Sequence, residues 1–393
     1  MREGCVDFYG ESELRERLEG ALRKKRPLRV KLGLDPSSPD IHLGHGVVLS
    51  KLRCFQDLGH TPIFLVGDFT ARIGDPSGRK KTRPALDEEA VRANATTYVE
   101  QASQFLDVER AEIRFNSEWM GKMSPEDFIV LCSRYTVARL LERDDFARRY
   151  KGGEPISVHE LLYPLVQAYD SVALEADVEL GGSDQTFNLL VGREIQRDYG
   201  QAPQAVITHP LLVGVDGSEK MSKSLGNAIG IREAPEEMYG QLMSISDVLM
   251  TEYYRILGVR DEEVTALGME VSSDDDPLGR KHQLAAALVA RFHGVAGAER
   301  GAEHFRKVVQ RKQLPDDLAE TTLALDGADE MGLLEILERL SLTQSRGEAR
   351  RLVSQGAVHV DQTRVADPTL RLGAGSYLLK VGKRRFARLQ LRP

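Results

Sequence analysis

The chain has 393 residues, 41% of them hydrophobic, which leaves room for two or three domains that each bury a core. No run of about 18 apolar residues occurs, and no basic segment precedes an apolar stretch near the start. This argues against a membrane span or a signal peptide and predicts a cytoplasmic protein. Three widely spaced cysteines without a CxxC pattern argue against a disulfide framework or a zinc site.

The net charge of −7 is unevenly distributed along the chain. Residues 331–393 carry 12 Lys and Arg side chains against 5 Asp and Glu, so the acidic excess lies in the preceding residues. A basic segment of this kind is compatible with RNA binding, because only the face that contacts the phosphates must attract them.

The first 230 residues have the pattern of an α/β domain. Residues 28–34 and 62–68 are expected to form buried strands, and apolar residues between them recur at helical spacing until Gly59. A strand, a helix and a strand in succession form a βαβ unit, which predicts a Rossmann-like parallel sheet that binds ligands at the carboxyl ends of its strands. The other elements predicted here are helices over residues 155–175 and 184–198 and a strand over residues 205–213.

The rest of the chain is expected to contain three parts. Residues 231–310 are predicted as a mainly helical domain, residues 311–332 as an acidic linker, and residues 333–393 as a small α+β domain. The elements predicted in the last part are helices over residues 333–340 and 345–355 and short strands over residues 358–365 and 376–391.

The first motif that carries chemistry is His42-Leu43-Gly44-His45, which lies where the first predicted strand is followed by a helix. The two imidazoles are three residues apart, so they share one face of the helix beside its N-terminus. Backbone N–H groups and the helix dipole favour anions at that end, and Gly44 leaves room for a nucleotide to approach. The alternative for this motif alone is a pair of surface histidines.

The second motif, Lys220-Met221-Ser222-Lys223-Ser224, follows the Asp216-Gly217 turn in a polar loop. Both lysines can reach a pyrophosphate leaving group, and a flexible loop can close on the transition state and reopen for release. Together with the upstream HxGH motif, this string resembles the signature motifs of the class I aminoacyl-tRNA synthetases. The resemblance implies an enzyme that activates an amino acid with ATP.

Further segments narrow the resemblance to the bacterial tyrosyl-tRNA synthetases, in the branch whose first active-site strand reads like Val30-Lys-Leu-Gly-Leu-Asp-Pro36. The other matching segments are residues 67–78, 163–170 and 181–185. The resemblance implies formation of tyrosyl-adenylate and pyrophosphate from tyrosine and ATP, with Mg²⁺ on the phosphates, and then transfer of tyrosine to the 3′ adenosine of tRNA(Tyr). It also implies a homodimer, with residues 231–310 on the anticodon side of the tRNA.

One predicted helix presents Tyr163, Gln167 and Asp170 on a single face, because they lie at i, i+4 and i+7. In the family pattern, Tyr163 and Gln167 hold the substrate α-ammonium together with Asp75. Asp170 accepts the phenol hydroxyl, and Gln185 faces the carboxylate. A site that hydrogen-bonds a substrate hydroxyl can reject the analogue lacking it by about four to five orders of magnitude, so no editing domain is needed.

The resemblance also places the nucleotide, with Gly182 and Asp184 on the ribose and Ser37 near the phosphates. The whole set that it implies is catalytic His42, His45, Lys220, Lys223 and Ser37; tyrosine-binding Asp75, Tyr163, Gln167, Asp170, Gln185, Lys31 and Thr70; and ATP-binding Asp35, Gly44, Gly182, Asp184, Lys223 and Met221, with no metal ligand.

Lys31 departs from the better-known branch of the family, in which this position holds a tyrosine that shares the phenol hydroxyl with the aspartate at Asp170. A lysine can donate a hydrogen bond to the phenol, or it can form a salt bridge with Asp170 and orient it. Both alternatives are open from the sequence.

Residues 342–361 resemble a small RNA-binding module that is shared with a ribosomal small-subunit protein. Arg346, Arg350 and Arg351 fall at helical spacing that suits a phosphate backbone. The alternative is an ordinary exposed basic helix. Two further residues assigned to RNA binding are Lys383 and Arg384.

Two other functions compete with this prediction. The first is a related adenylate-forming enzyme such as a tryptophanyl-tRNA synthetase, which the face of Tyr163, Gln167 and Asp170 and the basic tail oppose. The second is a non-catalytic RNA-binding paralogue. The two intact motifs oppose it, since a protein that only binds RNA needs neither.

Overall fold

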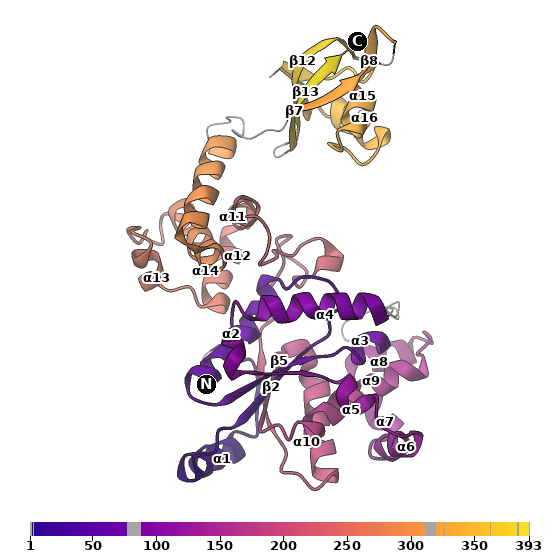
Figure 1. Cartoon of the computed structure of the whole chain (residues 1–393), viewed down its shortest axis with the longest axis vertical. Helices are drawn as coiled ribbons and strands as arrows, with labels where there is room; N and C mark the ends of the chain where they lie inside the picture. The colour runs from indigo at the N-terminus through magenta and orange to yellow at the C-terminus, as the bar shows by residue number, and fades with distance from the viewer. Residues whose placement is uncertain are drawn as a thin grey trace. The chain divides into compact units, whose positions relative to one another are not determined.

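The computed structural model describes residues 2, 4–76, 88–310, 320–325, 327–361, 363–382 and 385–392. They form two compact units, Met1–Ala298 and Glu299–Pro393. Figure 1 labels the helices and strands of both units along the chain. Within the described ranges, no helix is long and apolar enough to cross a membrane.

The first unit contains a six-stranded sheet of the order β1-β6-β5-β2-β3-β4. Its strands are β1 (Phe8–Tyr9), β2 (Arg29–Leu34), β3 (Thr61–Val66), β4 (Glu112–Phe115), β5 (Val178–Gly182) and β6 (Ala205–His209). Strands β2 to β6 are parallel, and β1 pairs antiparallel with β6. The predicted parallel sheet is confirmed. Its central strands are buried and largely apolar, as is typical of a parallel sheet covered on both faces, with Lys31 and Glu179 as buried charged exceptions.

The helices from α1 to α10 lie around this sheet in Figure 1. They are α1 (Glu11–Lys24), α2 (Leu43–Asp57), α3 (Thr70–Ile73), α4 (Glu88–Ala102), α5 (Ser117–Met120), α6 (Pro125–Ser133), α7 (Val137–Leu140), α8 (Asp144–Lys151), α9 (Val158–Ala173) and α10 (Thr186–Asp198). A further group of helices follows along the chain: α11 (Pro235–Ser244), α12 (Asp247–Leu257), α13 (Asp261–Ala266) and α14 (Pro277–Phe305). Short 3-10 turns lie at Val108–Arg110, Ser183–Gln185 and Lys223–Leu225, and a π turn at Arg306–Gln310.

The chain order of the strands creates a switch point in the sheet. From β2 the chain continues outward to β3 and β4, whereas from β5 it continues in the opposite direction to β6. Right-handed crossovers therefore put α2, which packs on β2 and β3, and α10, which packs on β5 and β6, on opposite faces. The two directions separate between β2 and β5, where a crevice for ligands is expected.

Helix α9 confirms the helix predicted over residues 155–175. It begins at a capping box in which Ser157 and Glu160 each bond the backbone of the other residue. Its buried face includes Tyr163, Val166 and Asp170, so the helix presents polar groups to the interior of the unit.

Residues 231–298 are mainly helical, as predicted, and they belong to the same compact unit as the sheet. Helices α11 to α14 supply this region, and α14 contains a non-helical residue at Gly294. The division into a catalytic domain and a helical domain at residue 230 stays a prediction.

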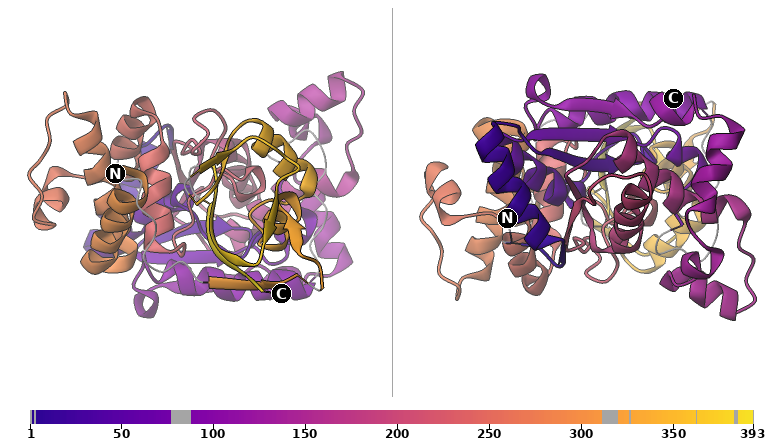
Figure 2. Two further views of the ribbon diagram at one scale, coloured as in Figure 1. Left: turned by 90° about the horizontal axis from the view of Figure 1, so that it is seen from above. Right: turned by 90° about the horizontal axis from the view of Figure 1, so that it is seen from below.

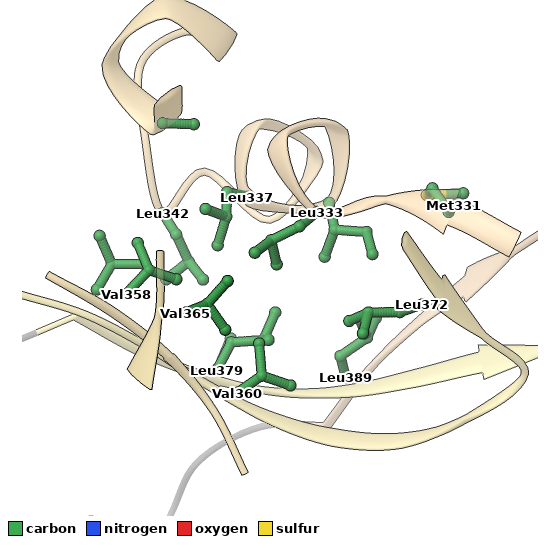
Figure 3. Close-up of a cluster of buried hydrophobic side chains, with 14 of the residues drawn as sticks. Met331, Leu333, Leu337, Leu342, Val358, Val360, Val365, Leu372, Leu379 and Leu389 are labelled. Atoms are coloured by element: carbon green, nitrogen blue, oxygen red, sulfur yellow. The ribbon is translucent and has the colours of Figure 1, made fainter. Parts of the chain in front are cut away.

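The second unit contains a five-stranded sheet of the order β10-β9-β12-β13-β7 and a separate pair, β11-β8. Its elements are β7 (Glu320–Ala324), β8 (Glu330–Gly332), α15 (Leu333–Arg339), α16 (Arg346–Ser354), β9 (Val358–Val360), β10 (Thr363–Val365), β11 (Arg371–Gly373), β12 (Gly375–Val381) and β13 (Arg385–Arg392). Its core joins Leu333 and Leu337 of α15 to Leu379 and Leu389 of the sheet, as Figure 3 shows.

The range 311–332, predicted as a linker, contains two strands of this unit. Strand β7 pairs in parallel with β13, and β8 pairs with β11. Both partners lie far along the chain, so their pairing leaves no local periodicity in the acidic segment. The prediction of a linker is therefore wrong for β7 and β8.

Candidate active site

A single cavity of about 640 Å³ in the first unit is lined by every residue predicted for catalysis, tyrosine or ATP. It lies at the carboxyl ends of β2 and β5, at the switch point of the sheet. Its volume falls within the roughly 300–1,000 Å³ of small-molecule sites. The fold thus brings together the residues predicted from the sequence, which come from β2, α2, α3, α9, β5 and the loop after β6.

The two motif histidines begin helix α2. His42 is the N-cap, and its Nδ1 accepts a hydrogen bond from the Gly44 N–H at 3.2 Å. The His42 N–H in turn donates to Nδ1 of His45 at 3.3 Å. Because both Nδ1 atoms accept, each neutral ring carries its proton on Nε2.

Both imidazoles are uncharged near neutral pH. Burial lowers the pKa of His42 to about 2, with further lowering by His45 and Lys223. Burial also lowers the pKa of His45 to about 4, again with help from the charge of Lys223. The start of α2 therefore offers neutral N–H donors beside the positive end of the helix dipole, which suits an anionic ligand.

Two carboxylates lie beside Tyr163 in the cavity. The Tyr163 hydroxyl donates to Oδ2 of Asp35 at 2.9 Å, and Thr70 Oγ1 donates to Oδ1 of Asp35 at 2.7 Å. Asp75 accepts from Gln185 Nε2 at 2.9 Å. Burial and the neighbouring carboxylates raise the pKa of Tyr163 well above its ordinary value, so the phenol remains protonated. This cluster suits a cationic group of a ligand.

Gln167 lies one turn after Tyr163 on α9 and lines the same cavity. Its Oε1 atom is buried and has no hydrogen-bond partner among the residues that the structure describes. A buried acceptor without a partner costs free energy that a donor on a bound ligand can recover. The side chain is therefore suited to bind a ligand N–H group.

Asp170 forms the polar end of the α9 face. It accepts from Trp119 Nε1 at 2.8 Å and from Asn116 Nδ2 at 3.3 Å. Burial raises the pKa of Asp170 to about 7, against a lowering by the charge of Lys31. Asn116 Nδ2 also donates to Thr70 Oγ1 at 3.0 Å, which connects this end of the cavity to the carboxylate of Asp35.

Lys31 pairs with Glu179 and not with Asp170. It is fully buried, and its Nζ lies 2.8 Å from Glu179 Oε1 and donates to Ser171 Oγ at 2.7 Å. The register of the parallel strands places Lys31 directly opposite Glu179. The alternative of a salt bridge to Asp170 is therefore wrong in this structure, because a neighbouring strand supplies a closer carboxylate.

The lysine-containing loop closes the other end of the cavity. Lys220 Nζ donates to Asp184 Oδ2 at 2.7 Å, and Lys223 Nζ bonds to Asp40. Gly182 precedes Asp184, and a Cβ at Gly182 would lie 2.8 Å from the Asp184 carboxylate. Glycine is thus required for the close approach of these groups, and two ammonium groups face the region expected for phosphates.

Sequence reasoning missed four residues of this network: Asn116, Trp119, Ser171 and Glu179. Trp119 is the single tryptophan of the chain, and Glu179 interrupts an apolar strand. A charged residue within a buried strand was a usable signal, because it requires a partner. The pairing of Glu179 with Lys31 could not be assigned from the sequence, because it depends on the register between their strands.

The predicted RNA-binding residues lie in the second unit. Arg346, Arg350 and Arg351 are all exposed on α16, and Arg346 also bonds to Glu338 at 2.8 Å. Lys383 and Arg384 lie outside the described residues.

The fold and the site define a class I aminoacyl-tRNA synthetase. Residues 23–310 match the family described as tRNA synthetases class I (W and Y), and residues 331–376 match the S4 domain. The tyrosine–tRNA ligase of Bordetella avium (strain 197N) is 54% identical over 391 residues, which cover 99% of this chain and 95% of the relative. The chain belongs to the family of tyrosine–tRNA ligases.

Other relatives agree with this membership. The tyrosine–tRNA ligase of Ralstonia nicotianae is 52% identical over 389 residues, with 99% of this chain and 98% of the relative covered. The solved tyrosyl-tRNA synthetase of Archaeoglobus fulgidus, complexed with L-tyrosine, is 25% identical with a TM-score of 0.58 and covers 76% of this chain and 96% of its own. A mitochondrial enzyme of Aspergillus nidulans, C-terminally truncated, has a TM-score of 0.62 at 22% identity over 78% of this chain and 91% of its own, and supports the fold alone.

Proposed function

We propose that the cavity binds tyrosine and ATP side by side and promotes attack of the tyrosine carboxylate on the α-phosphorus of ATP. The new bond gives tyrosyl-adenylate, and the bond to pyrophosphate breaks. Tyrosine then passes to the 3′ adenosine of tRNA. The observation that carries this proposal is the convergence of both motifs and the α9 face in one cavity.

In this proposal the tyrosine lies along α9. Its α-ammonium occupies the cluster of Asp75, Tyr163 and Gln167, where an unpaired Gln167 Oε1 can accept an N–H. Its phenol hydroxyl donates to Asp170, which Trp119 and Asn116 hold in place. Donors on both oxygens of a carboxylate fix its orientation before the substrate arrives.

The nucleotide occupies the other half of the cavity. The Nε2–H groups of His42 and His45 and the ammonium groups of Lys220 and Lys223 stabilise the charge that develops on the phosphates. Two carboxylates, Asp184 and Asp40, also lie near these lysines, but each is already paired with one of them. Among the described residues no group of three or more His, Cys, Asp or Glu side chains could hold a metal ion. Mg²⁺ is therefore proposed to accompany ATP as its phosphate complex.

The deciding experiment is ATP–pyrophosphate exchange with tyrosine and tryptophan side by side. Tyrosine-dependent exchange is the expected result. A preference for tryptophan would overturn the substrate, and no exchange in folded protein would favour the non-catalytic paralogue.

The second unit is proposed to bind tRNA through α16. We expect Arg350→Ala and Arg351→Ala each to weaken tRNA binding and to reduce its salt dependence by about one counterion, because each removes one phosphate contact. A binding titration over several salt concentrations measures both effects. Arg15→Ala, an exposed arginine on α1, is the matched control. Unchanged affinity in both α16 variants would contradict this surface.

A homodimer is proposed through α6, α7 and the first turn of α9, which carry exposed apolar side chains. Ile129, Val137 and Val158 are 67%, 59% and 73% exposed. The helices of residues 125–151 lie at the edge of the unit away from the N-terminus in both views of Figure 2. Exposed apolar side chains on neighbouring segments of the chain favour a self-complementary contact.

Val137→Asp is expected to convert a dimer into monomers of 43.7 kDa, because the symmetric contact would bury two added carboxylates. Light scattering after gel filtration measures the mass. Leu22→Asp, which adds the same charge at an 80% exposed position on α1, should leave the dimer intact. A dimeric Val137→Asp protein would place the interface elsewhere.

A further inference from the structure

The loop that carries the second motif is bonded to a buried asparagine three residues after it. Asn227 is 2% exposed, and its Oδ1 accepts from the Ser222 N–H at 2.7 Å. Its Nδ2 donates to the Lys220 carbonyl at 3.2 Å and, at a longer 3.4 Å, to that of Glu219. One side-chain amide thus bonds the backbone on both sides of Met221.

The same amide also bonds the turn that begins the loop. Asn227 Nδ2 donates to Asp216 Oδ2 at 2.6 Å. The other carboxylate oxygen of Asp216 accepts from the backbone N–H groups of Ser218 and Glu219 at 2.9 and 3.1 Å. Asp216 and Asn227 therefore form a clasp between the start and the end of the loop.

Gly214 leaves the space that this clasp occupies. A Cβ at Gly214 would lie 2.3 Å from Cγ and Nδ2 of Asn227, closer than real Cβ contacts allow. Gly214 is not in the left-handed region, so alanine there is limited by space and not by its backbone. Alanine at this position would displace the amide without removing it.

We propose that Asn227 is a positioning residue for adenylate formation, which fixes the backbone of residues 220–223 so that Lys220 and Lys223 face the phosphates of ATP. The proposal rests on the proposed function of the cavity. Lysine side chains are long and flexible, so a fixed backbone is what limits where the two charges can reach. In the structure Lys220 Nζ contacts Asp184, which lines the cavity, and Lys223 Nζ contacts Asp40, while both lysines line the cavity themselves. This agrees with a loop held over the cavity.

The direct test is Asn227→Ala in the full chain. We expect kcat of tyrosine-dependent ATP–pyrophosphate exchange to fall by about tenfold to a hundredfold, because a displacement of about 1 Å at catalytic groups has this effect. The KM for tyrosine should change less than about twofold, because the loop serves the transition state and not the tyrosine pocket. Loss of folded enzyme would also lower the apparent kcat at an unchanged KM, so kcat is expressed per active site, counted from the tyrosyl-adenylate formed in a single turnover.

Exchanging the two members of the clasp tests the bond itself. Asn227→Asp places two carboxylates against each other, and Asp216→Asn places two amides against each other. The double variant restores one donor and one acceptor between the two positions with their roles reversed, and the new carboxylate can still accept from the Ser222 N–H. It does not restore the donations to the carbonyls of Lys220 and Glu219, so recovery is expected to be partial. We expect the double variant to have about tenfold higher kcat than Asn227→Asp alone, a coupling that independent sites do not show.

Gly214→Ala supplies a test that leaves Asn227 in the sequence. It should lower kcat as Asn227→Ala does, whereas Gly20→Ala on α1, where a Cβ meets no atom within 4 Å, should have wild-type kcat. If Asn227→Ala does not fold, Gly214→Ala and the exchanged pair decide instead. Wild-type kcat in Asn227→Ala, or wild-type kcat in Gly214→Ala, would overturn the proposal. Absence of tyrosine-dependent ATP–pyrophosphate exchange in the wild-type protein would instead overturn the proposed function.

Discussion

Asp170→Ala is expected to lower the preference for tyrosine over phenylalanine by about four orders of magnitude, because the carboxylate is the group proposed to accept the phenol hydroxyl. In the wild-type site, phenylalanine would leave a buried Asp170 without its ligand partner, and this cost produces the discrimination. Alanine removes both the unpaired carboxylate that penalises phenylalanine and the hydrogen bond that favours tyrosine. The ratio of kcat/KM for the two amino acids in pyrophosphate exchange measures the effect.

Asp170→Asn is the matched variant, because it keeps an acceptor but places an amide N–H toward the donors of Trp119 or Asn116. Its preference should lie between those of the wild type and the alanine variant. A raised pKa of about 7 means that Asp170 gains a proton as the pH falls through that value. Wild-type kcat/KM for tyrosine should therefore decrease below about pH 7, and Asp170→Asn should lack this step. An unchanged amino-acid preference in both variants would remove Asp170 from phenol recognition.

The residues of the α9 face could be predicted because their arrangement is local. Tyr163, Gln167 and Asp170 share a face through helical spacing alone, and the two motifs are short strings whose chemistry depends on neighbouring residues. The parallel sheet then brings their separate elements to one edge, since a βαβ unit returns every strand in the same direction. Local pattern and sheet topology indicated the α9 face, the two motifs and the edge where they meet, whereas the other predicted cavity residues, such as Asp75 and Gln185, came from the family resemblance.

The pairing of Lys31 could not be predicted, because it depends on the register between two strands that are distant in the sequence. A shift of one residue would replace Glu179 by an apolar neighbour opposite Lys31. The same reason explains why the strand β7 was taken for a linker, as its partner β13 lies at the end of the chain. Non-local pairing carries little signal in the paired segments themselves.

His45→Ala and Lys223→Ala are each expected to raise the barrier to tyrosine activation by about 2–4 kcal/mol, with almost unchanged tyrosine affinity. Both groups are proposed to contact the phosphates, where charge develops only as the bond to pyrophosphate breaks. Single-turnover measurement of tyrosyl-adenylate formation gives the rate constant. Lys24→Ala, an exposed lysine on α1, is the control for loss of one charge.

The two variants should differ in the way they respond to pH. The lowered pKa of His45, about 4, means that the ring has already lost its extra proton and acts as a neutral donor through Nε2. The wild-type rate constant at saturating tyrosine should therefore not fall as the pH rises from about 6 to 8, the range in which an unperturbed imidazolium would lose its charge. A fall in that range that disappears in His45→Ala would show that the charged form is the active one. A wild-type rate in either variant would remove that residue from the transition state.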